Sequence, residues 1–170
     1  VCRRQIVALL SSKFLVKKGH SGLEFLAMTI GIPKETYPGE SRIAVVPGVL
    51  ASLTKAGLKV RIEKGAGLDA GFPDASFVEA GAEIVDSRKE VFEADVILQV
   101  RAGGANLLTG SEDLPLLKKG QVLISFLDPL GETGATKELA ATGVTALSME
   151  LMPRITRAQS MDALSSQATI

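Results

Sequence analysis

Short apolar runs that alternate with helical patterns constrain the fold of this chain more than any other feature of its sequence. Two of the runs, Val96–Val100 and Val122–Phe126, are almost continuously apolar, as is typical of strands buried on both faces. Helical patterns lie between the runs, most clearly over Gly48–Ala56 and Gly134–Thr142. This alternation predicts an α/β fold with a doubly wound, mainly parallel sheet and right-handed crossovers. The predicted strands are Thr29–Ile32, Leu58–Ile62, Ala82–Val85, Asp95–Val100, Gln121–Phe126 and Val144–Ser148.

The loops that follow four of these strands are the predicted ligand-binding region. In an open parallel sheet, ligands bind outside the carboxyl ends of the strands. The relevant loops begin after Ile32, Val100, Phe126 and Ser148. At the opposite edge, a glycine lies between a helical stretch and the next strand, which is the usual place for a left-handed helix cap. These glycines are Gly57, Gly81 and Gly143.

Composition excludes several classes of site. The chain has a single cysteine, Cys2, and a single histidine, His20, which rules out a disulfide framework and a Cys/His metal cluster within it. A Ser-His-Asp arrangement is also disfavoured, because His20 lies outside the expected core. Residues 28–170 carry more acidic than basic residues, have no basic stripe and contain few aromatics, so a nucleic-acid partner is not expected.

The first 27 residues differ from the rest of the chain. They carry five basic residues against one acidic residue, and their apolar run is far too short to span a bilayer. Such a composition fits an organellar transit peptide. A linker, cloning-derived residues or sequence translated from before a start at Met28 are the alternatives. We expect residues 1–27 to be a disordered leader, linker or extension, and residues 28–170 to form one domain.

Three loops contain residues that suggest a ligand, and each has a structural alternative. Arg42 could hold a carboxylate or carboxamide, or pair with Glu40 or Glu35. Gly65–Gly71 lacks the spacing of a dinucleotide-binding glycine motif and is better explained as a turn. The same holds for Arg101–Gly104, which follows a convincing strand but has only two adjacent glycines.

The segment Pro153–Ser166 is the densest polar segment of the chain. Ser160 is a good N-cap for a helix that would place Met161, Leu164 and Ala168 on its inner face. Side chains around the start of that helix can converge on one ligand: Arg154, Gln159, Asp162 and Ser165.

A carboxamide is the ligand group that these side chains match. Arg154 and Ser165 can donate to its oxygen, Asp162 can accept from its amine, and Gln159 can do either. The structural alternative is that Asp162 complements the helix dipole while the arginines, including Arg157, are solvated.

Several motifs resemble the family of alanine dehydrogenases and the α subunit of proton-translocating NAD(P) transhydrogenase. The resemblance extends from Met28 to Ile170 and implies the N-terminal, Rossmann-like lobe of that family. The last motif resembles transhydrogenase specifically, whereas the others are common to both branches. The motifs are Thr29–Glu35 (TIGIPKE), Glu40–Pro47 (ESRIAVVP), Glu63–Gly67 (EKGAG), Ala80–Val85 (AGAEIV) and Pro153–Ser166 (PRITRAQSMDALSS).

Two departures favour the transhydrogenase branch. Alanine dehydrogenases have a substrate-binding lysine where this chain has Arg101, and a catalytic histidine where it has Asp128. With no histidine after His20, the proton transfer of amino-acid oxidation has no evident agent. Direct hydride transfer between two nicotinamides depends on positioning instead. An alanine dehydrogenase-like lobe and a non-catalytic interaction domain are the remaining alternatives.

The resemblance also implies roles for the residues near the C-terminus. Arg154 and Ser165 would hold the nicotinamide carboxamide of NAD(H), Asp162 would orient Arg154, and Gln159 would lie toward the second nucleotide. Arg42 is a secondary candidate. No catalytic residue and no metal ligand is predicted within the chain.

The family's other parts are expected to lie outside this chain. They are the dinucleotide-binding Rossmann lobe, the membrane segments and the domain that binds NADP(H). The chain alone is therefore expected to be inactive, and its complete component to be a homodimer. The expected location is the cytoplasmic face of the inner membrane, as a peripheral component without a membrane span of its own, or alternatively the mitochondrial matrix side.

Overall fold

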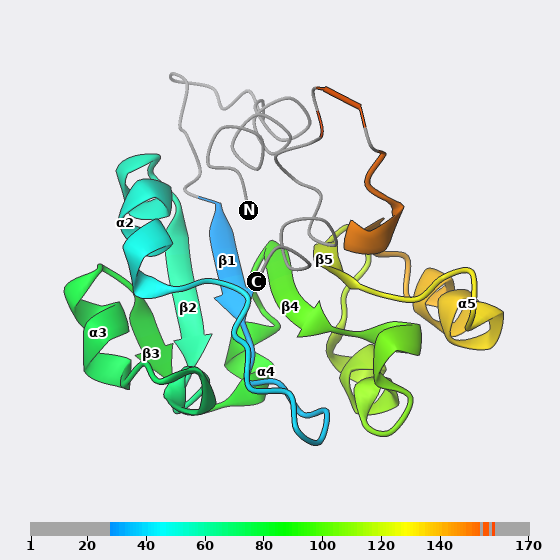
Figure 1. Cartoon of the computed structure of the whole chain (residues 1–170), viewed down its shortest axis with the longest axis horizontal. Coiled ribbons are helices and arrows are strands. Elements are labelled where there is room, and N and C mark those ends of the chain that lie inside the picture. Colours follow the sequence, from blue (N-terminus) through cyan, green and yellow to red (C-terminus); the bar gives the residue numbers. More distant parts are fainter. Residues whose placement is uncertain (1–27, 154, 157, 159–170) are drawn as a thin grey trace, which may run out of the picture.

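The fold is built around a six-stranded parallel sheet in the order β3-β2-β1-β4-β5-β6 (Figure 1). The computed structural model describes residues 28–153, 155, 156 and 158. The predicted doubly wound parallel sheet is confirmed, and each predicted strand agrees with the structure to within one residue at either end. The strands are β1 Thr29–Ile32, β2 Lys59–Glu63, β3 Glu83–Val85, β4 Val96–Arg101, β5 Val122–Phe126 and β6 Thr145–Ser148.

Four α-helices and four 3₁₀ segments connect the described strands. Two helices, α2 (Pro47–Lys55) and α5 (Thr133–Ala141), lie within one residue of their predicted positions. The helices α3 (Asp74–Glu79) and α4 (Arg88–Val91) were not predicted, because each is too short to show a helical period. The 3₁₀ segments are η1 Leu68–Ala70, η2 Gly103–Asn106, η3 Gly110–Leu116 and η4 Met149–Leu151.

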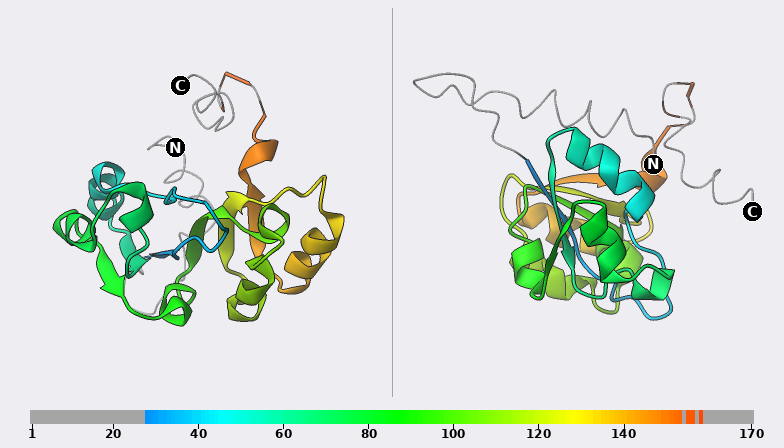
Figure 2. Two further views of the ribbon diagram at one scale, coloured as in Figure 1. Left: turned by 60° about the horizontal axis from the view of Figure 1, so that its bottom comes forward. Right: turned by 90° about the vertical axis from the view of Figure 1, so that its left-hand side faces the viewer.

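The helices cover both faces of the sheet, and each face has its own core. Leu50 and Leu53 of α2 and Phe77 of α3 pack on one face. Phe92, which follows α4, and Leu139 of α5 pack on the opposite face. Figure 2 shows the sheet between these two layers of helices. The result is the three-layer arrangement that a doubly wound sheet requires.

The alternation of side chains along β1 explains one glycine. Ile30 and Ile32 are fully buried on the face that α2 and α3 cover. Gly31 faces α4, where a Cβ atom would overlap the carbonyl oxygen of Val91. Only glycine therefore allows α4 to pack this closely against the sheet.

The strand order reverses between β1 and β4, at the centre of the sheet. β1 leads to α2 on one face, whereas β4 leads through η2 and η3 to the other face. The two loops therefore diverge and leave a crevice at the carboxyl ends of these strands, the usual ligand position in such folds. The helix caps at the other edge are also as predicted, with φ values of 81°, 94° and 76° at Gly57, Gly81 and Gly143.

Candidate functional site

Two arginines share one carboxylate at the crevice between β1 and β4. Glu40, in the loop after β1, is only 4% exposed in its side chain. Its Oε1 accepts from Arg42 Nε at 2.7 Å, and its Oε2 accepts from Arg101 Nε at 2.8 Å. The Arg101 guanidinium also stacks on the Tyr37 ring, 4.4 Å from its centroid. Arg42 therefore forms the pair with Glu40 that was one of the two predicted partners.

This pairing determines the charge of the cluster. Hydrogen bonds from Arg42, followed by those from its backbone and from Arg101, lower the pKa of Glu40 to about 2 despite its burial. Glu40 is consequently ionised at neutral pH. Two guanidinium groups around one carboxylate leave a net positive charge at the centre of the sheet edge.

Glu35 extends the hydrogen bonding between β1 and β4 beyond the point where the strands stop pairing. The two strands pair only at Ile30 with Val96 and at Gly31 with Ile97. Further along, the Glu35 carboxylate accepts from the backbone N–H groups of Val100 at 2.6 Å and Arg101 at 3.1 Å. Burial raises the pKa of Glu35, and these two hydrogen bonds oppose the rise. Glu35 thus attaches the loop that carries Glu40 to the end of β4.

Arg88, at the start of α4, is the centre of a second charged network. Its guanidinium makes two hydrogen bonds of 2.7 Å to the Asp113 carboxylate. It also donates to Glu63 Oε2 at 2.9 Å and to the Lys34 carbonyl oxygen at 2.8 Å. The buried Gln99 side chain donates to Asp113 as well. The network joins α4 and η3 to the carboxyl ends of β1, β2 and β4, and so fixes the loops that flank the crevice.

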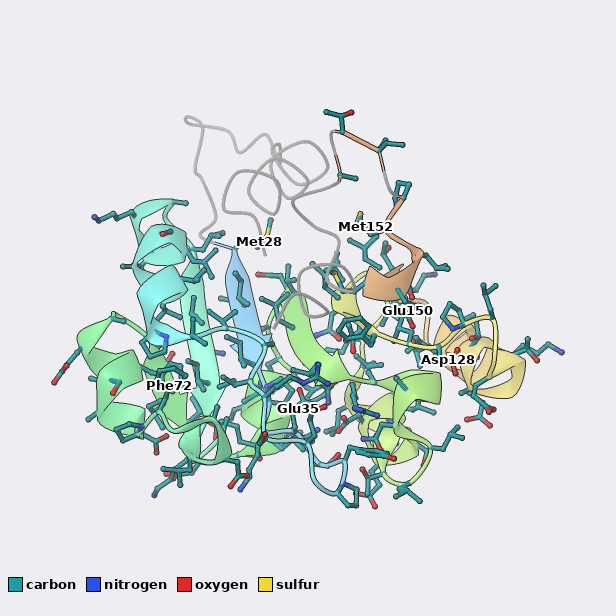
Figure 3. The ribbon with its side chains drawn as sticks, viewed as in Figure 1. Met28, Glu35, Phe72, Asp128, Glu150 and Met152 are labelled. Carbon is teal, nitrogen blue, oxygen red and sulfur yellow. The ribbon has the colours of Figure 1, made fainter. Side chains whose placement is uncertain are left out.

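A third contact joins the ends of β5 and β6. Glu150 Oε1 accepts from the backbone N–H of Leu127 at 2.8 Å and also from that of Asp128. Figure 3 shows Glu150 of η4 beside Asp128 of the β5–α5 loop. Asp128 has a φ of 45°, the one positive value among the described non-glycine residues. Its carboxylate accepts from the Gly131 N–H at 3.2 Å, a local turn that suits aspartate in this conformation.

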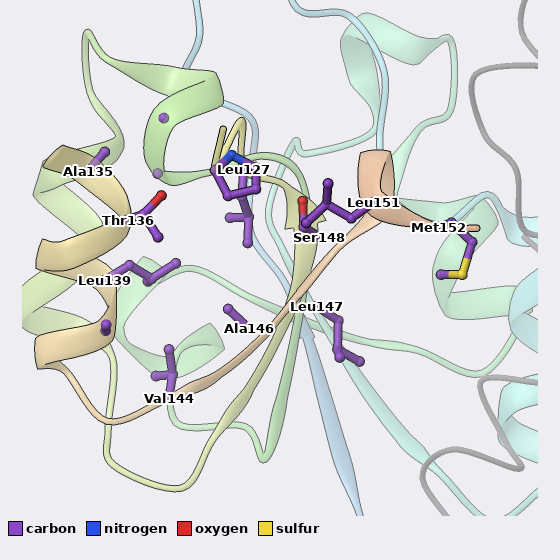
Figure 4. Close-up of a pocket in the computed structure, with 14 residues that line it drawn as sticks. Leu127, Ala135, Thr136, Leu139, Val144, Ala146, Leu147, Ser148, Leu151 and Met152 are labelled. Carbon is purple, nitrogen blue, oxygen red and sulfur yellow. The ribbon is translucent and has the colours of Figure 1, made fainter. Parts of the chain in front are cut away.

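A cavity of about 450 Å³ lies beside this contact, between α5, β6 and the ends of β4 and β5 (Figure 4). Its wall is mostly apolar: Leu139 comes from α5, Ala146 from β6, and Leu151 and Met152 from η4 and the residue after it. Leu127 closes the side nearest Glu150. The cavity therefore lies against the segment that leads to Pro153.

The predicted nicotinamide-binding residues Arg154, Gln159, Asp162 and Ser165 lie outside the described residues. The predicted helix after Ser160 and residues 1–27 also lie outside them. Among the residues that are described, both glycine-containing loops follow the structural alternative. Gly65–Gly71 forms turns and η1, with positive φ at Gly65 and Gly71, and Gly103 opens the 3₁₀ segment η2.

Sequence reasoning did not identify Arg88, Asp113 or Glu150 as site residues. A partial signal existed for Glu150, since an acidic residue two positions after a strand end lies where parallel strands expose unpaired amides. Arg88 and Asp113 are 25 residues apart, and nothing local indicates their contact. Within the described ranges, no group of three or more His, Cys, Asp or Glu side chains could hold a metal ion. None of the helices there is long and apolar enough to cross a membrane.

Comparison with known proteins gives consistent matches. Residues 31–170 match the family model described as "Alanine dehydrogenase/PNT, N-terminal domain". The first of the separate chains that make up the NAD(P) transhydrogenase alpha subunit of Rhodospirillum rubrum is 40% identical over 144 residues, which cover 84% of this chain and 37% of that protein. The alanine dehydrogenase of Methanococcus maripaludis is 38% identical over 124 residues, covering 72% of this chain and 32% of that enzyme.

A solved structure gives the same result. The crystal structure of transhydrogenase from Sinorhizobium meliloti superposes with a TM-score of 0.75 and 40% identity, covering 82% of this chain and 38% of that one. The chain thus spans less than two fifths of the length of the transhydrogenases it is compared with here.

Proposed function

The chain belongs to the alanine dehydrogenase/PNT N-terminal domain family, as its motifs predicted, and from this membership we propose that it is the N-terminal lobe of the NAD(H)-binding component of proton-translocating NAD(P) transhydrogenase. The transhydrogenase relatives match a larger share of this chain than the alanine dehydrogenase does. The reaction would move a hydride from NADH to NADP⁺, giving NAD⁺ and NADPH, with NADP(H) held by a partner domain.

The observation that carries this choice of branch is the state of Arg101 and Asp128. The resemblance aligns them with the substrate-binding lysine and the catalytic histidine of alanine dehydrogenases. Here the Arg101 guanidinium is engaged by the internal carboxylate of Glu40 and by Tyr37. Asp128 lies in a left-handed turn, with its carboxylate on Gly131. Neither residue supplies the base that oxidation of an amino acid needs, whereas hydride transfer between two nicotinamides depends on positioning.

The residues proposed to bind NAD(H) have the donor set that a nicotinamide carboxamide requires. Arg154 and Ser165 would donate to its oxygen, Asp162 would orient Arg154, and Gln159 would lie toward NADP(H). When bound, the nicotinamide supplies the hydride chemistry itself. The role of this chain is then to set the angle and distance of the ring.

We further propose that the rest of the component supplies the remaining parts of the assembly. These are the Rossmann lobe that grips the dinucleotide, a second copy in a homodimer, and the membrane and NADP(H)-binding components. The complex would place this lobe on the cytoplasmic face of the inner membrane, or on the matrix side of the mitochondrial membrane.

The test is a chimeric subunit in which residues 28–170 replace the corresponding segment of the Rhodospirillum rubrum protein, assembled with the other transhydrogenase components. The unmutated chimera should reduce NADP⁺ with NADH. Arg154→Ala should lower the hydride-transfer rate about a hundredfold, because misplacing the ring by about 1 Å has an effect of that size. NADH affinity should change much less, since most of the binding energy comes from the remote parts of the dinucleotide.

Arg157→Ala is the matched control, three residues further on and without a predicted ring contact. Equal slowing by both substitutions would refute the assignment of Arg154. A chimera that is folded, as judged by its circular dichroism, but forms no NADPH would refute the proposed function, and oxidation of alanine by it would favour the other branch.

A further inference from the structure

The side chain of Glu150 connects two segments that the sheet itself does not join. Pairing between β5 and β6 runs from Val122 with Thr145 to Ser125 with Ser148. Beyond Ser148 the chain turns into η4, and there Glu150 Oε1 accepts from the N–H groups of both Leu127 and Asp128. One carboxylate oxygen thus continues the connection where the ladder has ended.

The contact requires an ionised carboxylate and holds an unusual backbone. Burial acts to raise the pKa of Glu150, but the nearby Ser148 hydroxyl and the backbone N–H groups outweigh it, so the pKa lies below its usual range. The Asp128 residue that Glu150 holds has left-handed backbone geometry, which is unfavourable for a residue with a side chain. A charge-assisted acceptor shared by two successive amides is well suited to stabilise that turn.

The contact is also close to the end of the described chain that matters for the proposed site. Glu150 is four residues before Arg154 in the sequence. Leu151 and Met152, which lie between Glu150 and Pro153, line the same cavity as Leu127. The segment that leads to Arg154 is therefore attached to the end of β5 by a polar contact and by apolar packing on the same side.

We propose that Glu150 is a positioning residue for the nicotinamide site: by binding the amides of Leu127 and Asp128, it sets the place from which the Arg154 segment starts. This inference rests on the proposed function. Glu150 itself touches neither the cofactor nor the reacting atoms in this account. Its effect on the reaction acts through the geometry of the chain that follows it.

The contact can be tested directly in the 170-residue chain by amide hydrogen exchange. Glu150→Ala should accelerate exchange at Leu127 and Asp128 at least about tenfold, because both N–H groups lose their acceptor. Glu150→Gln should retain most of the protection, since its carbonyl oxygen can accept from the same groups and its length is unchanged. Unaltered exchange at both amides in Glu150→Ala would overturn the proposal.

The effect on the reaction is measured in the Rhodospirillum rubrum chimera. Glu150→Ala should lower the hydride-transfer rate per folded molecule by about 10- to 100-fold while NADH affinity stays within about threefold. Glu150→Gln should recover most of that loss, and it remains informative if the alanine variant does not fold.

Asp74→Ala is the matched control, because the Asp74 carboxylate also accepts from a loop amide, that of Gly65 at 2.9 Å, at the other end of the sheet. It should lower stability and leave the rate within about threefold. Equal rate losses in Asp74→Ala and Glu150→Ala, or a Glu150→Ala variant with an unchanged rate, would make Glu150 merely structural. An inactive but folded unmutated chimera would instead remove the proposed function, while the exchange result for Glu150 would still stand.

Discussion

Removing the Arg88 guanidinium should destabilise the chain more than removing any surface charge. Arg88 is 21% exposed, and its partners Glu63 and Asp113 are 17% and 8% exposed. Arg88→Met keeps the length and the apolar stem of the side chain but leaves both carboxylates and the Gln99 amide without their shared partner. Breaking a buried pair by removing one member costs about 3–5 kcal/mol. The two bidentate hydrogen bonds to Asp113 place Arg88 within that range.

The assay is urea unfolding, followed by far-ultraviolet circular dichroism. With a slope of about 2 kcal/mol per molar urea, the expected loss lowers the unfolding midpoint by about 1.5–2.5 M. Arg88→Lys should lie between the wild type and Arg88→Met, because an ammonium keeps the charge but cannot form the planar pair. Adding Asp113→Asn to Arg88→Met should cost less than the sum of the single effects, because the two residues act on each other.

The matched control is Arg61→Met, which removes the partly exposed pair with Glu83 on the sheet edge, an N–O distance of 3.0 Å. Exposed pairs of this kind contribute about 0–1 kcal/mol, so the midpoint should shift by less than about 0.5 M. If Arg88→Met and Arg61→Met lowered the midpoint equally, the buried network would not hold the loops around the crevice as described.

Two further substitutions test the packing of β1 and the charge of the crevice. Gly31→Ala should lower the free energy of unfolding by about 1–3 kcal/mol, because its Cβ would meet the Val91 backbone, and an unchanged urea midpoint would contradict this packing. Glu40 has a folded pKa of about 2, below its ordinary value of 4.5, so its contribution is complete above about pH 4.5 and is lost as the pH falls toward 2. The stability difference between the wild type and Glu40→Gln should therefore shrink between about pH 5 and about pH 2.5, and a constant difference in urea midpoint would refute this.

The strands could be predicted from the sequence because their burial produces apolar runs. Val96–Val100 reads as a central strand, and in the structure it is buried throughout in β4, between β1 and β5. By contrast, α4 has only one helical turn, and its place on the sheet depends on Gly31 and on Arg88, which lie 57 positions apart in the sequence. Such a helix is stabilised by tertiary contacts rather than by its own pattern.

The same distinction applies to the candidate site. The loops expected to meet after β1, β4, β5 and β6 are the loops that contain Glu35, Arg101, Asp128 and Glu150, because the parallel arrangement brings their starting points to one edge. The pair between Glu40 and Arg42 was one of two local alternatives, since the residues are two positions apart. The sharing of Glu40 with Arg101, across 61 positions, depends on the strand order, which the apolar pattern does not contain.

The central place of β1 in the strand order also has a consequence for synthesis on the ribosome. β1, β2 and β3 are consecutive along the chain and adjacent in space, so these three strands can associate as soon as residues 29–85 have emerged. The other edge of β1 has no partner until residues 96–101 follow, and an unpaired strand edge is a template for pairing with other chains. Because β1 has only four residues, with a glycine among them, this edge is short while the nascent chain waits for β4.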